Sequence, residues 1–109
     1  MFPLALYLLI GALFVVLGLP LKHEKIPPNW FYGFRTRKTL SSAEIWYPVN
    51  RVAGGDMVVT GFVLILAALV MLAIRNWVAP ETAVIILSLV GVGMSVWMLV
   101  HGFSVLRRM

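Results

Sequence analysis

The sequence has no cysteine and few charged residues. The absence of cysteine among the 109 residues excludes a disulfide framework, a thiolate metal site and a cysteine nucleophile. Only 12% of the residues are charged, whereas 61% are hydrophobic. A soluble domain of this length exposes far more polar surface. The composition therefore indicates an integral membrane protein.

The sequence also lacks the motifs of common catalytic and nucleotide-binding sites. It contains no HExxH, GxSxG, phosphate-loop or dinucleotide-binding pattern. The side chains suited to acid–base chemistry or metal binding form no motif: His23, Glu24, Glu44, Asp56, Glu81 and His101. We therefore expect no catalytic residue, no metal and no cofactor, and an enzyme acting on a lipid or peptide is the least favoured class.

Three stretches carry no formal charge: Met1–Leu21, Met57–Ile74 and Thr82–Val100. A membrane-spanning helix needs about 20 mostly apolar residues, and backbone groups in lipid must be satisfied within the segment. The sequence thus predicts a single all-α membrane domain. Its three transmembrane helices are expected near residues 2–21, 56–75 and 82–105, with a long loop over residues 22–55.

The basic residues are distributed unevenly along this topology. Eight of the nine lie in the long loop or the C-terminal tail, and only Arg75 lies in the turn between the second and third spans. The excess of Lys and Arg on cytoplasmic loops predicts a cytoplasmic loop and C-terminus, an external N-terminus and a location in the bacterial inner membrane. Because these charges flank apolar spans and form no basic face, the net charge of +5 does not indicate nucleic-acid binding.

Small residues recur every seven positions in the spans. They are Gly11 and Gly18 in the first, Gly54, Gly61 and Ala68 in the second, and Ser88, Ser95 and Gly102 in the third, with Gly91 on the same side. Small residues allow helix backbones to approach closely in a bilayer, and this spacing favours left-handed crossing. We expect packing seams at these positions.

The long loop is predicted to contain a short amphipathic helix that lies on the membrane surface. Ser41 together with Glu44, or Ser42 alone, is a candidate N-cap, and apolar residues follow at helical spacing up to Val52, including Trp46. Pro48 predicts a kink or restart, and the glycine pair that begins at Gly54 predicts a bend into the membrane.

One polar cluster is predicted where the loop meets the spans. Asp56 begins the second span and His101 lies near the end of the third, so the two side chains should have a similar depth. Arg51 lies about one turn before Asp56 and is expected to join them. The alternative is an N-terminal carboxylate favoured by the helix dipole and a histidine that reaches water.

The loop resembles the SdpI family of small bacterial membrane proteins. The resemblance is carried by Asn29, Trp30, Tyr32, Gly33, Arg35, Thr36, Thr39, Ser42, Trp46, Asn50, Arg51 and Gly54. The family takes its name from an immunity protein that protects the producer of a secreted peptide toxin, so the resemblance implies a binding role for these residues. Arg35 and Arg51 suit a lipid phosphate, a carboxylate or loop carbonyls, or they only fold the loop onto the membrane.

Two classes of function are favoured over the enzyme. The first is a binding, immunity or signalling module whose partners are the bilayer and a peptide toxin or regulatory protein. The second is a transporter subunit for an ion or small molecule that forms a homo-oligomer. The lack of an acidic residue in mid-membrane weighs against proton-coupled export.

Overall fold

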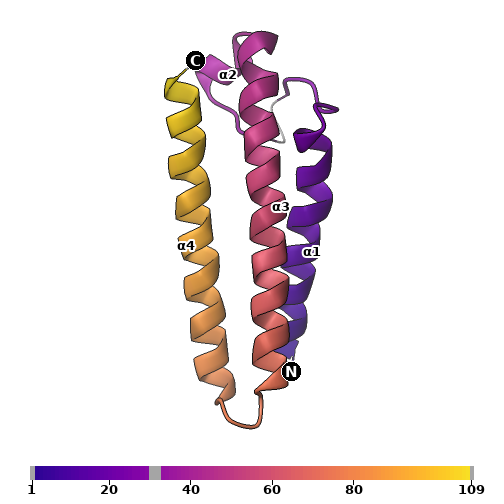
Figure 1. Cartoon of the computed structure of the whole chain (residues 1–109), viewed down its shortest axis with the longest axis vertical. Helices are drawn as coiled ribbons and strands as arrows, with labels where there is room; N and C mark the ends of the chain where they lie inside the picture. Colours follow the sequence, from indigo (N-terminus) through magenta and orange to yellow (C-terminus); the bar gives the residue numbers. More distant parts are fainter. Residues whose placement is uncertain (1, 30–32, 109) are drawn as a thin grey trace.

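The computed structural model describes residues 2–29 and 33–108, and every regular element within these residues is a helix. The helices are α1 (Phe2–Lys22), α2 (Arg37–Leu40), α3 (Ala43–Ala73) and α4 (Pro80–Arg107). The long helices α1, α3 and α4 run side by side in a molecule of 51 × 22 × 18 Å (Figure 1). All three are long and apolar enough to cross a membrane. The predicted all-α membrane architecture is therefore confirmed.

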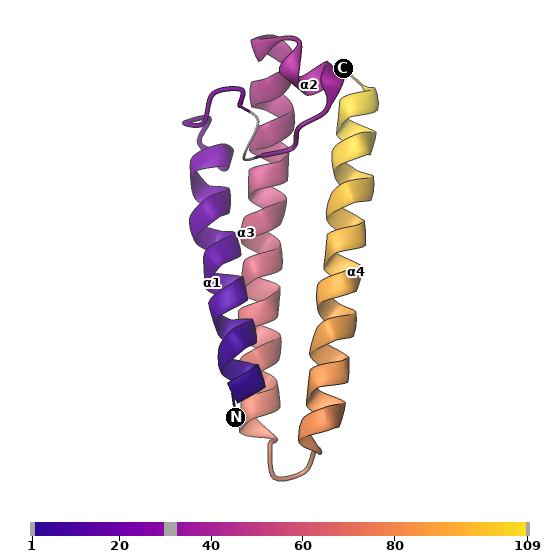
Figure 2. The same ribbon diagram turned by 180° about the vertical axis from the view of Figure 1, so that it is seen from behind.

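The two ends of the bundle differ in structure. The N-terminus and the short α3–α4 turn lie at one end, and the long loop, α2 and the C-terminus lie at the other (Figures 1 and 2). We call the second end, formed by residues 22–29 and 33–42, the first turns of α3 and the last turns of α4, the loop-bearing end. The candidate residues of the loop that the structure describes gather there.

Glycines bring α1 and α3 into backbone contact. A Cβ added to Gly11 would lie 2.7 Å from the carbonyl oxygen of Gly61, and one added to Gly18 would lie 2.6 Å from that of Gly54. Real Cβ atoms do not approach other atoms so closely. Since apolar side chains gain little by leaving lipid, such close approach is a main source of helix association in membranes. The predicted small-residue seam is confirmed for this helix pair.

Helix α4 packs mainly on α3 and makes few contacts with α1. Near the α3–α4 turn, Leu87 is buried with Leu4 and Ala68. At the loop-bearing end, Gly102 lies against the ring of Phe34, where an added Cβ would be 2.6 Å from a ring carbon. One hydrogen bond of 2.6 Å joins the hydroxyls of the α1 residue Tyr7 and the α4 residue Ser88. Helix α4 is thus fixed at both ends and leaves space beside α1.

The structure corrects the expectation of a separate interfacial helix over residues 42–52. These residues are the first turns of α3, which runs without interruption through Pro48 and Gly54. Pro48 lies in the second turn, where its missing N–H deprives only the carbonyl of the exposed residue Glu44 of a helical hydrogen bond. Trp46, which is 0% exposed, is buried by the protein itself.

Helix α3 is longer than a bilayer requires. Its 31 residues extend over about 46 Å at about 1.5 Å per residue. The hydrocarbon core is only about 30 Å thick. Helix α3 is therefore longer than the hydrocarbon layer is thick, and we expect its first turns, which support the loop, at the level of the headgroups.

Candidate functional site

The side chain of Asn50 holds the loop against α3. Its Oδ1 accepts a hydrogen bond of 2.5 Å from the N–H of Phe34, and its Nδ2 donates to the carbonyls of Phe34 at 3.3 Å and Trp46 at 3.1 Å. Asn50 is 1% exposed. Gly33 has a φ of +111°, and a Cβ there would lie 2.6 Å from Oδ1 of Asn50, so this position suits only glycine. These residues of the family-like motif thus fold the loop.

A second set of hydrogen bonds shapes the loop around α2. The backbone N–H of Thr36 donates to the Thr39 hydroxyl at 2.6 Å, and the Thr39 N–H donates to the Thr36 hydroxyl at 3.1 Å. Ser42 is the N-cap of α3, which is one of the two caps that the sequence allowed. The indole N–H of Trp46 donates to the carbonyl of Ile26 at 2.8 Å. Most of the motif's uncharged polar groups are therefore committed to the loop's own fold.

The remaining motif residues occupy different places. Asn29 donates a hydrogen bond of 2.9 Å to the carbonyl of Pro27. Trp30 and Tyr32 lie outside the residues that the structure describes. Arg51, with its side chain 58% exposed, lies 3.7 Å from the carboxylate of Glu24. That exposed pair contributes little to stability, because water and salt screen it.

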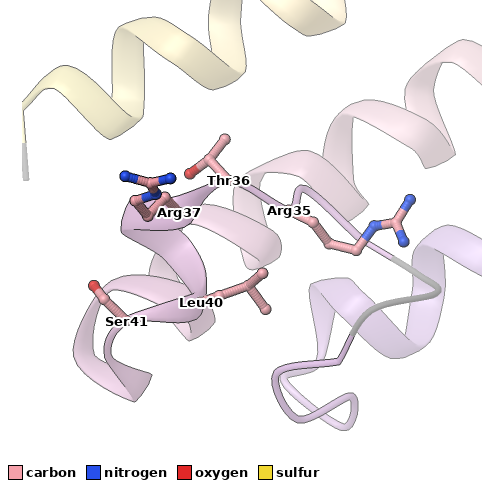
Figure 3. Close-up of a pocket in the computed structure, with 5 residues that line it drawn as sticks. All are labelled: Arg35, Thr36, Arg37, Leu40 and Ser41. Atoms are coloured by element: carbon pink, nitrogen blue, oxygen red, sulfur yellow. The ribbon is translucent and has the colours of Figure 1, made fainter.

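An open cavity of about 730 Å³ lies beside α2. We call it the basic pocket; its lining residues are Arg35, Thr36, Arg37, Leu40 and Ser41 (Figure 3). The Ser41 hydroxyl donates to the carbonyl of Lys38 at 2.6 Å, and the Lys38 ammonium donates to the carbonyl of Leu106 at 3.0 Å. The second bond ties α2 to the end of α4. Sequence reasoning selected Arg35 and Thr36 but missed Arg37, Leu40 and Ser41, because the cavity depends on the turn that α2 makes.

Asp56 and His101 join α3 to α4 near the loop-bearing end. Oδ2 of Asp56 lies 2.6 Å from Nδ1 of His101, and the His101 ring stacks on that of Trp97 with centroids 5.5 Å apart. The carboxylate side chain is only 10% exposed, whereas that of His101 is 41% exposed. The structure therefore brings together two of the three residues of the predicted polar cluster. The third, Arg51, pairs with Glu24 instead, so that part of the prediction is wrong.

A crevice runs between α1 and α4. It consists of two adjoining cavities of about 430 and 290 Å³ that share Ser95 and Leu99. We call it the α1–α4 crevice; its walls include Tyr7, Phe14, Ser88, Gly91, Val92 and Met98. Among the residues that the structure describes, its lining includes no Asp, Glu, Lys or Arg. The sequence pattern marked three of the small residues of its α4 wall as a packing seam, yet this seam is not filled within the chain.

These features define a small multi-pass membrane protein with an apolar crevice between its spans and a folded basic loop at one end. Residues 25–101 match the SdpI/YfhL protein family, so the chain belongs to that family.

Among known proteins, the chain is similar to the uncharacterised protein YfhL of Bacillus subtilis (strain 168), with 33% identity over 57 residues. This match spans 50% of the chain and 50% of that relative. No solved structure matches the chain.

Proposed function

We propose that the protein is a membrane-embedded binding module of the immunity type, which holds an apolar helical peptide in the α1–α4 crevice. In this proposal the module lies in the inner membrane with its N-terminus outside, because the positive-inside bias favours a cytoplasmic loop-bearing end. The family resemblance supports a membrane-active peptide as the ligand. The length of the crevice along α4 and its apolar lining support the same ligand.

The observation that carries the proposal is the unfilled small-residue seam of α4. Ser88, Gly91 and Ser95 line the crevice. A Cβ added to Gly91 would meet only a methyl carbon of Leu64 at 3.9 Å, which is ordinary contact. Small residues at this spacing let a second helix approach closely in a bilayer. Within the chain, no helix fills that role along the described part of α4.

The side-chain hydroxyls of the crevice have hydrogen-bond partners within the chain, so a ligand does not need to supply them. The hydroxyls of Tyr7 and Ser88 bond each other, and the Ser95 hydroxyl donates to the carbonyl of Gly91 at 2.8 Å. From Ser88 to Leu99 the α4 wall extends over about 17 Å, or about three helical turns. An apolar helix of that length would be shielded from lipid along one side.

The absence of charge from the crevice lining favours binding over transport. A path for an ion or a proton through the bilayer needs ionisable or polar groups along its length. The pair formed by Asp56 and His101 lies at the loop-bearing end, and neither residue lines the crevice. A transporter subunit therefore has less support than a binding module.

The proposal is tested with two matched glycine variants of α4. Gly91→Leu would fill the crevice, whereas Gly93→Leu would place the same side chain in open space, where a Cβ meets no atom within 4 Å. Bacteria expressing each variant at equal membrane levels would be exposed to a panel of synthetic membrane-permeabilising apolar helices.

We expect the wild-type protein and Gly93→Leu to raise the inhibitory concentration of at least one peptide, and Gly91→Leu to lose this effect. Equal protection by both variants, or no protection against any peptide, contradicts the proposal. Loss of a homodimer in Gly91→Leu without any effect on peptide killing would show that a second copy fills the crevice.

A further inference from the structure

The net charge of the protein is concentrated at the loop-bearing end. Eight basic and three acidic residues belong to the loop, the adjoining turns of α3 and the C-terminal end, which leaves the whole net charge of +5 there. At the opposite end, Arg75 and Glu81 balance each other. Basic residues beside a membrane attract anionic lipids, at about 1 kcal/mol for each Lys or Arg near the surface.

The basic pocket is a cavity in which two of these basic residues, Arg35 and Arg37, can contact a ligand. Two of the three acidic residues at this end already have partners, since Glu24 pairs with Arg51 and Asp56 with His101. The described residues that line the pocket include no Asp or Glu. Among residues 2–29 and 33–108, Arg37 forms no ion pair. Arg37 therefore brings to the pocket a positive charge that no ion pair among these residues neutralises.

The chemistry of the lining favours an anion attached to an apolar body. The Thr36 and Ser41 hydroxyls bond to groups of the loop itself, so attraction for a ligand comes mainly from the guanidinium groups. Figure 3 shows that Arg35 and Arg37 project in different directions and that the Leu40 side chain points to the side on which Arg35 lies. Leu40 is partly buried and offers an apolar contact in the pocket. A guanidinium group matches phosphate oxygens in a bidentate geometry.

The position of the pocket matches the headgroup layer of a bilayer. The bond from Lys38 to Leu106 holds α2 beside the last turn of α4, where that span ends. Helix α1 ends at the same end of the bundle, at Lys22. The bonds made by Asn50 hold the loop on α3, so the pocket stays at this level.

We infer that the basic pocket binds the phosphate headgroup of an anionic phospholipid, with Arg37 and Arg35 supplying positive charge from two sides of the pocket and Leu40 against the start of an acyl chain. This lipid site is separate from the α1–α4 crevice and stands whether or not the crevice binds a peptide. The family-like motif then has two roles. Its amide and hydroxyl groups fold the loop, and the folded loop presents arginines to the lipid.

The test compares arginines inside and outside the pocket. Purified protein in a neutral detergent is titrated with phosphatidylglycerol or phosphatidylcholine, and bound lipid is counted by native mass spectrometry. Arg37→Ala and Arg51→Ala each remove one charge from an exposed side chain at the same end, but only Arg37 lines the pocket. Circular dichroism verifies that the helix content of each variant is unchanged.

We expect the wild-type protein to bind one phosphatidylglycerol in preference to phosphatidylcholine. Arg37→Ala should weaken this binding about fivefold and Arg35→Ala/Arg37→Ala about 25-fold, since about 1 kcal/mol per arginine corresponds to about a factor of five. Arg51→Ala should change it less than about twofold, because its guanidinium lies outside the pocket.

Three results would overturn the inference. Equal losses in Arg37→Ala and Arg51→Ala would show that a diffuse surface charge, and no pocket, attracts the lipid. Displacement of phosphatidylglycerol by an equal concentration of inorganic phosphate would identify a free-phosphate site. Tighter binding of a hexaglutamate peptide than of phosphatidylglycerol would identify an acidic protein segment as the ligand.

Discussion

Replacement of Gly54 by alanine tests the helix contact on which the bundle depends. An alanine Cβ at this position would collide with the backbone nitrogen of Lys22 and lie 2.6 Å from the carbonyl oxygen of Gly18. Both obstacles are backbone atoms, so no side-chain rotation can relieve the contact. Helix α1 must move away from α3, and the packing along the whole seam is then weakened.

The neighbouring residue Gly55 provides a matched control. A Cβ there meets no atom within 4 Å, and both glycines lie inside α3. In either position, alanine gains up to about 1 kcal/mol of helix propensity over glycine. Overpacking at Gly54 costs about 1–3 kcal/mol. We therefore expect Gly55→Ala to raise the free energy of unfolding by up to about 1 kcal/mol, and Gly54→Ala to fall about 1–3 kcal/mol below it.

The assay is unfolding of the purified protein by SDS in mixed micelles. Tryptophan fluorescence follows the transition, because Trp46 is fully buried where the loop meets α3. The comparison between the two variants removes the shared helix-propensity effect and leaves the cost of the contact. If Gly54→Ala is as stable as Gly55→Ala, backbone contact between α1 and α3 does not hold the bundle together.

Three further predictions concern the topology, the polar pair and the loop. Because the chain has no native cysteine, Asn76→Cys and Ser41→Cys are unique probes: an impermeant thiol reagent should label only the first in intact cells, and labelling of the second would reverse the orientation. A double-mutant cycle of Asp56→Ala and His101→Ala should give a coupling free energy of about 1–2 kcal/mol. This value is below that of a fully buried charged hydrogen bond, because the histidine is partly exposed. Additive effects of the two substitutions would refute the pairing. Asn50→Ala should cost about 1–3 kcal/mol and speed hydrogen exchange in the loop, since it leaves buried backbone groups without a partner; unchanged exchange would show that other bonds hold the loop.

The arrangement of the spans was predictable because it depends on patterns that are local in sequence. Length and apolar composition identified the three spanning helices, and the seven-residue spacing of Gly11 and Gly18 identified the face of α1 that meets α3. The start of α3 was harder to predict. Pro48 and Gly54 are signals for a helix break, yet tertiary packing overrides both. Trp46 is buried under the loop, and Gly54 allows the backbone of α1 to approach α3 closely.

The candidate site was predictable only in part, because it depends on contacts between distant segments. Asp56 and His101 are far apart in sequence, but the topology alone predicts that they lie at a similar depth, and the two side chains do meet. The partner of Arg51 is Glu24, across the whole length of the loop, and no periodicity indicates it. The basic pocket likewise arises from the turn at α2, a helix of four residues that carries no apolar repeat.

The division of contacts among the helices has a consequence for the order of assembly. A chain emerges from the ribosome N-terminus first, so α1, the loop and α3 are available to pair through their glycines before α4 has been made. Helix α4 then joins an existing helix pair. Its contacts with the loop, Gly102 against Phe34 and the Leu106 carbonyl with Lys38, lie within the last eight residues of the chain. The loop-bearing end is therefore completed only after the last turns of α4 have been made, and a chain truncated before Gly102 would insert its spans without closing that end.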